Sequence, residues 1–193
     1  MVRNEPPFLP IALLISLIFA EFYKLENNTL QNITNTMRES FKSGSSFGVA
    51  SGIITTLGLV MGLSTGTHSI IAVIGGILSI AIADGLSEST AMHISRKSEN
   101  KDMKYVREST FSTLLSKFFI TLTFAIPFLL IDLHTAMKVD ILWGLFLTAL
   151  ISYLVSPKQK WEKGRDILEH LVIVAFVVLV TYNAGEWLHA KFS

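Results

Sequence analysis

The chain has 193 residues, of which half are hydrophobic and only 16% are charged, and its mean hydropathy is +0.51. A soluble domain carries about 25% charged residues, so this composition excludes an ordinary soluble domain and favours one bundle of membrane helices. The net charge of +1, without a basic stripe interleaved with aromatics, argues against nucleic-acid binding. The lack of cysteine excludes disulfides, thiolate metal sites and cysteine nucleophiles.

The first hydrophobic segment, residues 8–23, is short for a membrane span, and Glu21 interrupts its end. It fits a tilted sixth span or a helix lying in the membrane interface. Residues 24–42 are polar and are typical of a solvated linker or a surface helix. We therefore assign residues 1–45 to an N-terminal hydrophobic helix with a polar linker, and residues 46–193 to a transmembrane, transporter-like domain.

Five strong apolar segments follow, each long enough to cross a membrane. They cover residues 46–65, 69–92, 112–132, 139–155 and 168–188. The predicted fold class is therefore all-α, a polytopic membrane helix bundle with five core transmembrane helices and the weaker N-terminal hydrophobic helix.

Thirteen of the sixteen basic residues lie in three segments, residues 24–42, 93–117 and 156–166. Lysine and arginine accumulate in the cytoplasmic loops of membrane proteins. We therefore expect an integral, multi-pass protein of the cell membrane, with the loops 93–117 and 156–166 in the cytoplasm. Lys117, at the end of the second loop, is expected to extend its ammonium group to the cytoplasmic interface.

Nine of the twelve glycines lie between residues 44 and 85, and six of them form two series with a spacing of four. The series are Gly44, Gly48 and Gly52, followed by Gly58, Gly62 and Gly66. Each series leaves a bare stripe on one helix face, along which another backbone can approach closely. Helix packing is the ordinary use of such a stripe, and a dimer seam or a moving gate is the functional one.

Asp84 and Glu88 come after a stretch, from Ser43 to Ala83, that contains no Asp, Glu, Lys or Arg. They lie inside the second strong span or at its inner end, where a charge costs roughly 2.5–3.5 kcal/mol on insertion scales. Met92 continues the same helix face at the same spacing. Carboxylates suit hard divalent ions, and a thioether shifts the preference toward ferrous iron. The alternatives are that Met92 packs in the core and that Glu88 pairs with a basic residue of the cytoplasmic loop.

The same two acids suggest proton exchange. Two adjacent carboxylates cannot both ionise cheaply without a cation, so one is expected to hold a proton that an arriving metal displaces. This hypothesis requires both acids to face the bundle interior without a permanent clamp by arginine or lysine.

Polar residues elsewhere in the spans offer weaker candidates. Glu169 opens the last span and either lines the pathway or is a helix N-terminal charge favoured by the dipole. Asp132, His134 and Asp140 surround the outer loop, where they form an exit vestibule or a solvated loop. His68 in the outer turn and His93 near the inner end of the second span are too far apart in sequence to predict one site.

The string ADGLSESTAMHISRKSE at residues 83–99 resembles the second-span signature of the vacuolar iron transporter family, commonly ADGFSMAAGNYLSTKSE. SGIITTLGLVMGLSTG at 51–66, FAIPFLL at 124–130 and LEHLVI…VTYNAG within 168–185 are similar to other spans of that family. The resemblance implies a dimeric bundle that moves ferrous iron or manganese out of the cytoplasm against protons.

The chain departs from the family pattern at three positions. Ser51 stands where the family has a metal-site Asp, Glu88 where its motif has Met, and Ile80 where many members have a third acid. The cytoplasmic metal-collecting domain of plant members is reduced to the linker 96–111. By charge count, we expect Glu88 to compensate for the acid missing at Ser51.

These observations predict a secondary transporter that exports a divalent transition metal, Fe²⁺ or Mn²⁺, in exchange for protons. The predicted metal ligands are Asp84, Glu88, Met92 and Glu169, and the metal is the substrate, not a cofactor. The expected partners are the metal ion, protons, the lipid bilayer and a second copy of the chain in a homodimer. The alternative is a non-transporting membrane scaffold or assembly protein that keeps the family fold.

No catalytic or cofactor-binding residue is predicted, and we do not expect an enzyme. The chain has no HExxH motif, and GLSTG at residues 62–66 lacks the strand–turn–helix context of a hydrolase nucleophile. It also has no GxxxxGK[ST] loop, which argues against transport driven by ATP.

Overall fold

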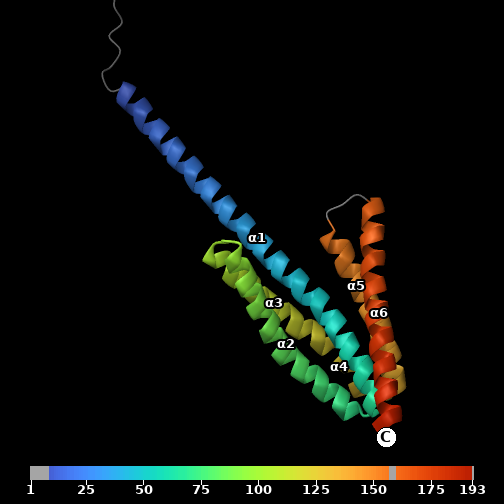
Figure 1. The fold of residues 1–193 in the computed structure, drawn as a ribbon. Helices are drawn as coiled ribbons and strands as arrows, with labels where there is room; N and C mark the ends of the chain where they lie inside the picture. Colours follow the sequence, from blue (N-terminus) through green and yellow to red (C-terminus); the bar gives the residue numbers. More distant parts are fainter. Residues whose placement is uncertain (1–8, 157–159, 193) are drawn as a thin grey trace, which may run out of the picture. The chain divides into compact units, whose positions relative to one another are not determined.

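The computed structural model (Figure 1) describes the backbone of residues 9–156 and 160–192, and the side chains of residues 35, 39–156 and 163–192. These residues form helices joined by short turns, with no strand in the described part of the chain. The helices are α1 (Leu9–Thr67), α2 (Ile70–Ser98), α3 (Met103–Thr123), α4 (Ala125–Leu130), α5 (Leu133–Val155) and α6 (Lys160–Phe192). The all-α class predicted from the sequence is thereby confirmed.

The chain divides into two compact units, residues 1–39 and residues 40–193. In the first unit the structure describes a helical backbone from Leu9 onward, which includes most of the polar segment 24–42. The side chains of residues 8–23 lie outside the described residues, and so does the question of whether that segment spans a membrane. All that follows concerns residues 40–193.

Five helices are long and apolar enough to cross a membrane, as the hydropathy pattern predicted. They cover Glu39–Thr67, Ile70–Ser98, Met103–Leu130, Leu133–Val155 and Lys163–Phe192. The third span is broken between α3 and α4, because Pro127 has no N–H to offer the carbonyl of Thr123 and its ring crowds that carbonyl. This break is a kink of the third span at Pro127.

The helices begin where short polar side chains cap them. The hydroxyl of Ser69 accepts from the Ala72 N–H, and the carboxylates of Asp102 and Asp132 accept from N–H groups in the first turns of α3 and α5. Such caps satisfy backbone donors that have no partner inside the helix. His68 and Asn100 end the preceding helices with φ of 50° and 55°, which turns the chain sharply.

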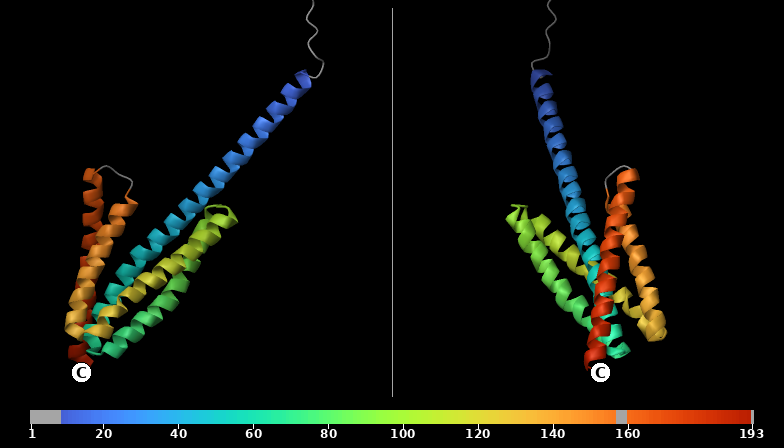
Figure 2. Two further views of the ribbon diagram at one scale, coloured as in Figure 1. Left: turned by 180° about the vertical axis from the view of Figure 1, so that it is seen from behind. Right: turned by 45° about the vertical axis from the view of Figure 1, so that its right-hand side comes forward.

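Both glycine series of α1 lie against helices of the same chain. Gly44, Gly48 and Gly52 face α3, and an added Cβ at Gly48 would be 2.5 Å from the carbonyl oxygen of Thr113. Gly58, Gly62 and Gly66 face α6, where the Cα of Gly185 is 3.5 Å from the position of a Cβ on Gly66. Figure 2 shows α2 beside α3 and α5 beside α6 in both of its views. The second unit therefore places α1 between two helix pairs.

The core is formed where these pairs meet α1. Its buried side chains include Leu57 and Met61 of α1, Ile77 of α2, Phe128 of α4 and Val174 of α6. Many large apolar side chains point outward instead, which is the pattern expected of helices that face lipid. The fold thus defines an integral, multi-pass membrane protein.

Candidate functional site

A charge cluster connects α2 and α3 in the interior of the second unit. The Lys117 side chain of α3 is completely buried, and its Nζ lies 2.5 Å from Asp84 Oδ2 and 2.6 Å from Glu88 Oε1. The side chains of Asp84 and Glu88 are 29% and 20% exposed. Both acids thus turn toward a neighbouring helix, and one ammonium group bridges them.

The third helix of the cluster is α1. The hydroxyl of Ser51 donates a hydrogen bond to Glu88 Oε2, the carboxylate oxygen that does not face Lys117. Gly48 and Gly52 flank Ser51 in sequence, and a Cβ on Gly52 would lie 3.4 Å from Lys117 Cγ. The glycine series of α1 therefore allows the close approach of α3 that brings Lys117 beside Ser51 and Glu88.

The position of Lys117 corrects one expectation. Instead of extending to the interface, its ammonium group is enclosed in the bundle, because two carboxylates are there to pair with it. Glu88 does pair with a basic residue, one that lies well inside α3 and not in a flexible loop. Lysine thus occupies the centre of the predicted metal site, and the condition that no arginine or lysine clamps the two acids is not met in this structure.

The geometry also relates Ser51 to Glu88. The family resemblance assigns an acid to position 51, and the structure places the carboxylate of Glu88 in contact with Ser51. That Glu88 compensates for an acid missing at Ser51 stays a prediction, since the structure shows only this hydrogen bond. Together, two carboxylates, one hydroxyl and one ammonium form a cluster with a formal charge of −1.

The two remaining predicted ligands lie apart from the ion pairs. Met92 is 7% exposed and belongs to the buried face of α2, one helical turn beyond Glu88. Glu169 is on α6, 58% exposed, and its carboxylate accepts from Arg165 Nε at 2.9 Å. Within the described residues, no group of three or more His, Cys, Asp or Glu side chains is arranged to hold a metal ion. Glu169 therefore does not complete a site with Asp84 and Glu88.

The residues expected around the outer loop separate into different environments. Asp132 is exposed and caps α5, and the hydrogen bond from the Thr135 N–H is the main reason that its pKa lies below the usual value. Asp140, two helical turns further on, is completely buried. These acids do not form a common vestibule.

Three histidines meet at this end of the bundle, a cluster that the sequence did not predict. The ring centroids of His68 and His189 are 4.3 Å apart, and those of His68 and His134 are 6.4 Å apart. The three residues come from a turn, the start of α5 and the end of α6. Only the knowledge that all three helix ends lie at one end of the bundle could have brought them together.

At the opposite end, polar contacts tie α1 to the hairpin of α2 and α3. Ser40 donates to Glu108 Oε2 at 2.6 Å, and Arg96 Nη2 donates to Ser43 Oγ at 2.6 Å. Arg96 also pairs with Glu99, and this hydrogen bond is the largest cause of the lowered pKa of Glu99. These contacts hold the three helices of the charge cluster in register.

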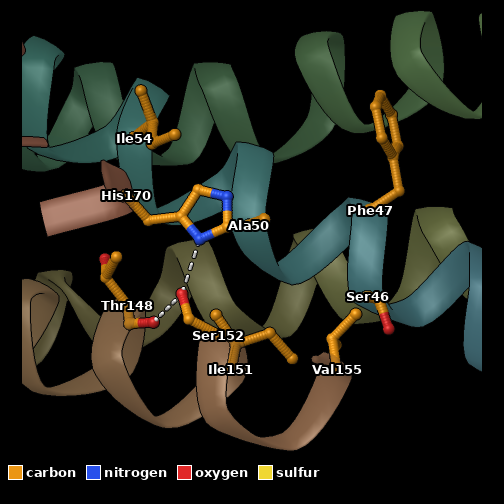
Figure 3. A pocket seen from close by; sticks show the side chains of 9 residues that line it. All are labelled: Ser46, Phe47, Ala50, Ile54, Thr148, Ile151, Ser152, Val155 and His170. Carbon is orange, nitrogen blue, oxygen red and sulfur yellow. Dashed lines mark hydrogen bonds between the residues drawn. The ribbon is translucent and has the colours of Figure 1, made fainter. Parts of the chain in front are cut away.

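A pocket of about 250 Å³ lies between α1, α5 and α6 (Figure 3). Its polar feature is His170, whose Nδ1 is 2.9 Å from the hydroxyl of Ser152. The Ser152 hydroxyl in turn donates to the carbonyl oxygen of Thr148 at 2.7 Å. The other lining side chains are mostly apolar and include Phe47, Ile54, Ile151 and Val155. The pocket offers no acid for a metal ion.

Comparisons with family models, with curated proteins and with solved structures found no match to this chain. The fold therefore defines the class, a multi-pass helical membrane protein, and the likeness to vacuolar iron transporters depends on the sequence motifs alone.

Proposed function

We propose that the chain is a secondary transporter of a divalent transition metal, ferrous iron or manganese, which it exports from the cytoplasm in exchange for protons. The observation that carries this proposal is the buried cluster of Asp84, Glu88 and Lys117, to which Ser51 adds a hydroxyl. Ionisable groups at such a depth are costly and usually mark an ion pathway. No comparable group of paired charges joins the spans elsewhere in the described residues.

In this proposal the ammonium group of Lys117 occupies the position between the two carboxylates that the transported ion would take. Carboxylate oxygens bind a hard or borderline divalent cation more readily than an ammonium group when the cation can reach them. An arriving metal would displace Nζ from Asp84 and Glu88, and Met92 would provide a soft ligand after a small rotation of α2.

Charge balance connects metal binding to protons. Two carboxylates and one ammonium sum to −1, whereas two carboxylates and a divalent ion sum to zero. The ammonium must then move to water or give its proton away, because two cations cannot share one buried pair of acids. Release of that proton would exchange one proton for each metal ion.

The orientation of the chain in this proposal follows from the basic loops, which by the positive-inside rule belong to the cytoplasm, and the export direction is what the family resemblance implies. A homodimer remains part of the proposal through the family resemblance. Both glycine series of α1 already contact α3 and α6 of the same chain, so the dimer would use another surface.

The decisive experiment measures uptake of Fe²⁺ and Mn²⁺ into proteoliposomes that contain a pH-sensitive dye. We expect metal uptake by the wild type to be accompanied by proton movement in the opposite direction, which the dye reports as a pH change inside the vesicles. We expect the metal flux of Asp84→Asn to be at least tenfold lower. Glu169→Gln is the matched control, since it neutralises an exposed acid on α6 and should leave the flux unchanged. A wild-type protein without metal flux would overturn the proposal.

A second candidate function is a membrane scaffold or assembly protein. The same lysine favours it, because a permanent ion pair would neutralise the acids and remove the reason for metal to bind. A scaffold should show no stabilisation by Mn²⁺, and its Ser51→Asp variant should gain none. A transporter should bind Mn²⁺ in the wild type and more tightly in Ser51→Asp.

A further inference from the structure

Asp140 is the most isolated acid in the described part of the chain. It lies on the buried face of α5 together with Ala136, Met137 and Gly144, and none of its surface is exposed. Neither of its carboxylate oxygens has a hydrogen-bond partner. It is eight residues, about 12 Å along the helix, from the N-cap Asp132.

The elements packed around α5 bring no charge to Asp140. Leu57 of α1 lies against Gly144, one helical turn away, and α4 and α6 also contact α5. Residues 43–67, 125–130 and 171–185 contain no Asp, Glu, Lys, Arg or His, and Tyr182 is their only titratable residue. The phenol of Tyr182 is in a side chain that is 42% exposed.

An ionised carboxylate is not stable in such a place. Burial without a partner removes the hydration of the charge, and in practice such a group takes up a proton instead. The contrast with Asp84 and Glu88 is direct, since those acids have an ammonium group within 2.6 Å. Asp140 therefore has the chemistry of a proton carrier, and the Lys117 cluster has the chemistry of a cation site.

We propose that Asp140 is a proton-binding site inside the bundle, which holds a proton while the core encloses it and releases the proton when water reaches it. The exit lies toward the end that carries His68, because Asp140 is in the first half of α5 and His134 begins that helix. The imidazole rings of His68, His134 and His189 lie together at this end and carry ring nitrogens that can accept a hydrogen bond or a proton. The role of this proton in metal exchange depends on the function proposed above.

The test of the site itself needs no transport. Dicyclohexylcarbodiimide reacts with protonated carboxyl groups in apolar surroundings, and mass spectrometry of the full-length protein in lipid identifies the modified residue. At neutral pH we expect at least tenfold more adduct at Asp140 than at Asp132, which is exposed on the same helix. Asp140→Asn should lose this adduct, and Asp132→Asn should keep it.

A second measurement covers the case in which Asp140→Asn does not fold. Infrared difference spectra of the wild type should contain the carbonyl band of a protonated acid, and deuterium oxide should shift it. Labelling of the wild type should also fall as the pH rises. Absence of both the adduct at Asp140 and the protonated-acid band at neutral pH would overturn the proposal.

The two proposals can fail separately. If the wild type moves no metal but Asp140 is labelled, the transport function is wrong and the proton site stands. If metal flux continues while both the adduct at Asp140 and the protonated-acid band are absent, the proton site is wrong. In a labelled, transporting protein, Asp140→Asn should reduce the pH change that accompanies the metal to the one proton per ion that Lys117 accounts for, and an unaltered pH change would exclude Asp140 from the coupling.

Discussion

Acidic side chains have different surroundings on the two sides of α1. Toward α2 and α3, two acids share one buried lysine and accept a further hydrogen bond from Ser51. Toward α5 and α6, one acid lies alone among apolar side chains. Both sides use glycine to bring helices close, so close packing does not explain the difference. The difference arises because α3 supplies a cation at its interface with α1 and α2, whereas α4 and α6 supply none near Asp140.

The contrast shows that one bundle can hold two kinds of buried acid. Asp84 and Glu88 are paired with an ammonium group, whereas neither carboxylate oxygen of Asp140 has a hydrogen-bond partner. In the proposed function the paired acids would bind the metal ion and Asp140 would hold a proton, on different sides of α1.

Replacing Lys117 by methionine should have the largest effect. It leaves Asp84 and Glu88 without their counter-ion, and breaking a buried pair in this way costs about 3–5 kcal/mol. We expect a large loss of thermal stability in lipid or detergent, with recovery in a variant that also carries Asp84→Asn and Glu88→Gln. Addition of Mn²⁺ should partly restore Lys117→Met alone if the acids bind metal. Lys138→Met, which removes an exposed lysine of α5, is the control and should have little effect.

Gly185→Ala tests the other side of α1. Its Cβ would meet the Thr65 hydroxyl and would be 2.6 Å from the carbonyl oxygen of Gly62, and backbone cannot move away as a side chain can. Overpacking of this kind costs about 1–3 kcal/mol. Gly75→Ala is the matched control, since nothing lies within 4 Å of that Cβ, and better helix propensity should make it neutral or up to about 1 kcal/mol more stable. Equal stability of the two variants in thermal unfolding would contradict this packing of α1 on α6.

Ser51→Ala should have a smaller effect than either change. It removes the hydrogen bond to Glu88 Oε2 but leaves Lys117 in place. Hydrogen bonds between membrane helices contribute about 1 kcal/mol, so we expect a modest decrease in thermal stability. Thr55→Val is a suitable control, because the Thr55 hydroxyl bonds only to the carbonyl of Ser51 within its own helix turn. A loss as large as that of Lys117→Met would mean that Ser51, and not Lys117, holds the acids in place.

The smallest expected effect is the contribution of Asp132 to thermal stability, which changes only at acidic pH. Its pKa is lowered in the folded state, chiefly by the hydrogen bond from Thr135, below the usual value of 3.8. The stabilisation is therefore complete above pH 3.8 and is lost as the pH falls through the lowered pKa. Asp132→Asn keeps a capping oxygen without this titration. Thermal unfolding between pH 5 and 2 should show a slightly steeper loss for the wild type, and identical curves would exclude this contribution of Asp132.

Much of the fold could be predicted from the sequence, because each helix that crosses a membrane requires a long run of apolar residues. Each span is a long apolar run, and the five predicted segments correspond to the five helices of the second unit. Even the break at Pro127 followed from a local rule of backbone hydrogen bonding. The predicted domain boundary after residue 45 stays a prediction, and the structure divides the chain between Glu39 and Ser40.

Only part of the candidate site could be predicted from the sequence. The spacing of Asp84 and Glu88 showed that both acids share one face of a helix, since that depends on helix geometry alone. The partner could not be inferred, because Lys117 is 29 residues further along the chain than Glu88, and a lysine near a span end usually extends to the interface. Glu169 illustrates another limit, because the start of the apolar run placed it at a helix N-terminus, whereas α6 already begins at Lys160 and Glu169 pairs with Arg165 one turn before it.

The sequence by itself determined that the chain forms five apolar spans and that two acids share one face of the second span. Those features depend on neighbours within a few residues and on the cost of bringing a polar backbone into lipid. The helical spans extend up to nine residues beyond the predicted segments. Only the tertiary structure decided which charges meet: it paired Lys117 with two acids, gathered three histidines from distant helix ends and left Asp140 alone. The reason is that helix packing brings together residues far apart in sequence, and the charge that a buried acid can keep depends on what packing places beside it.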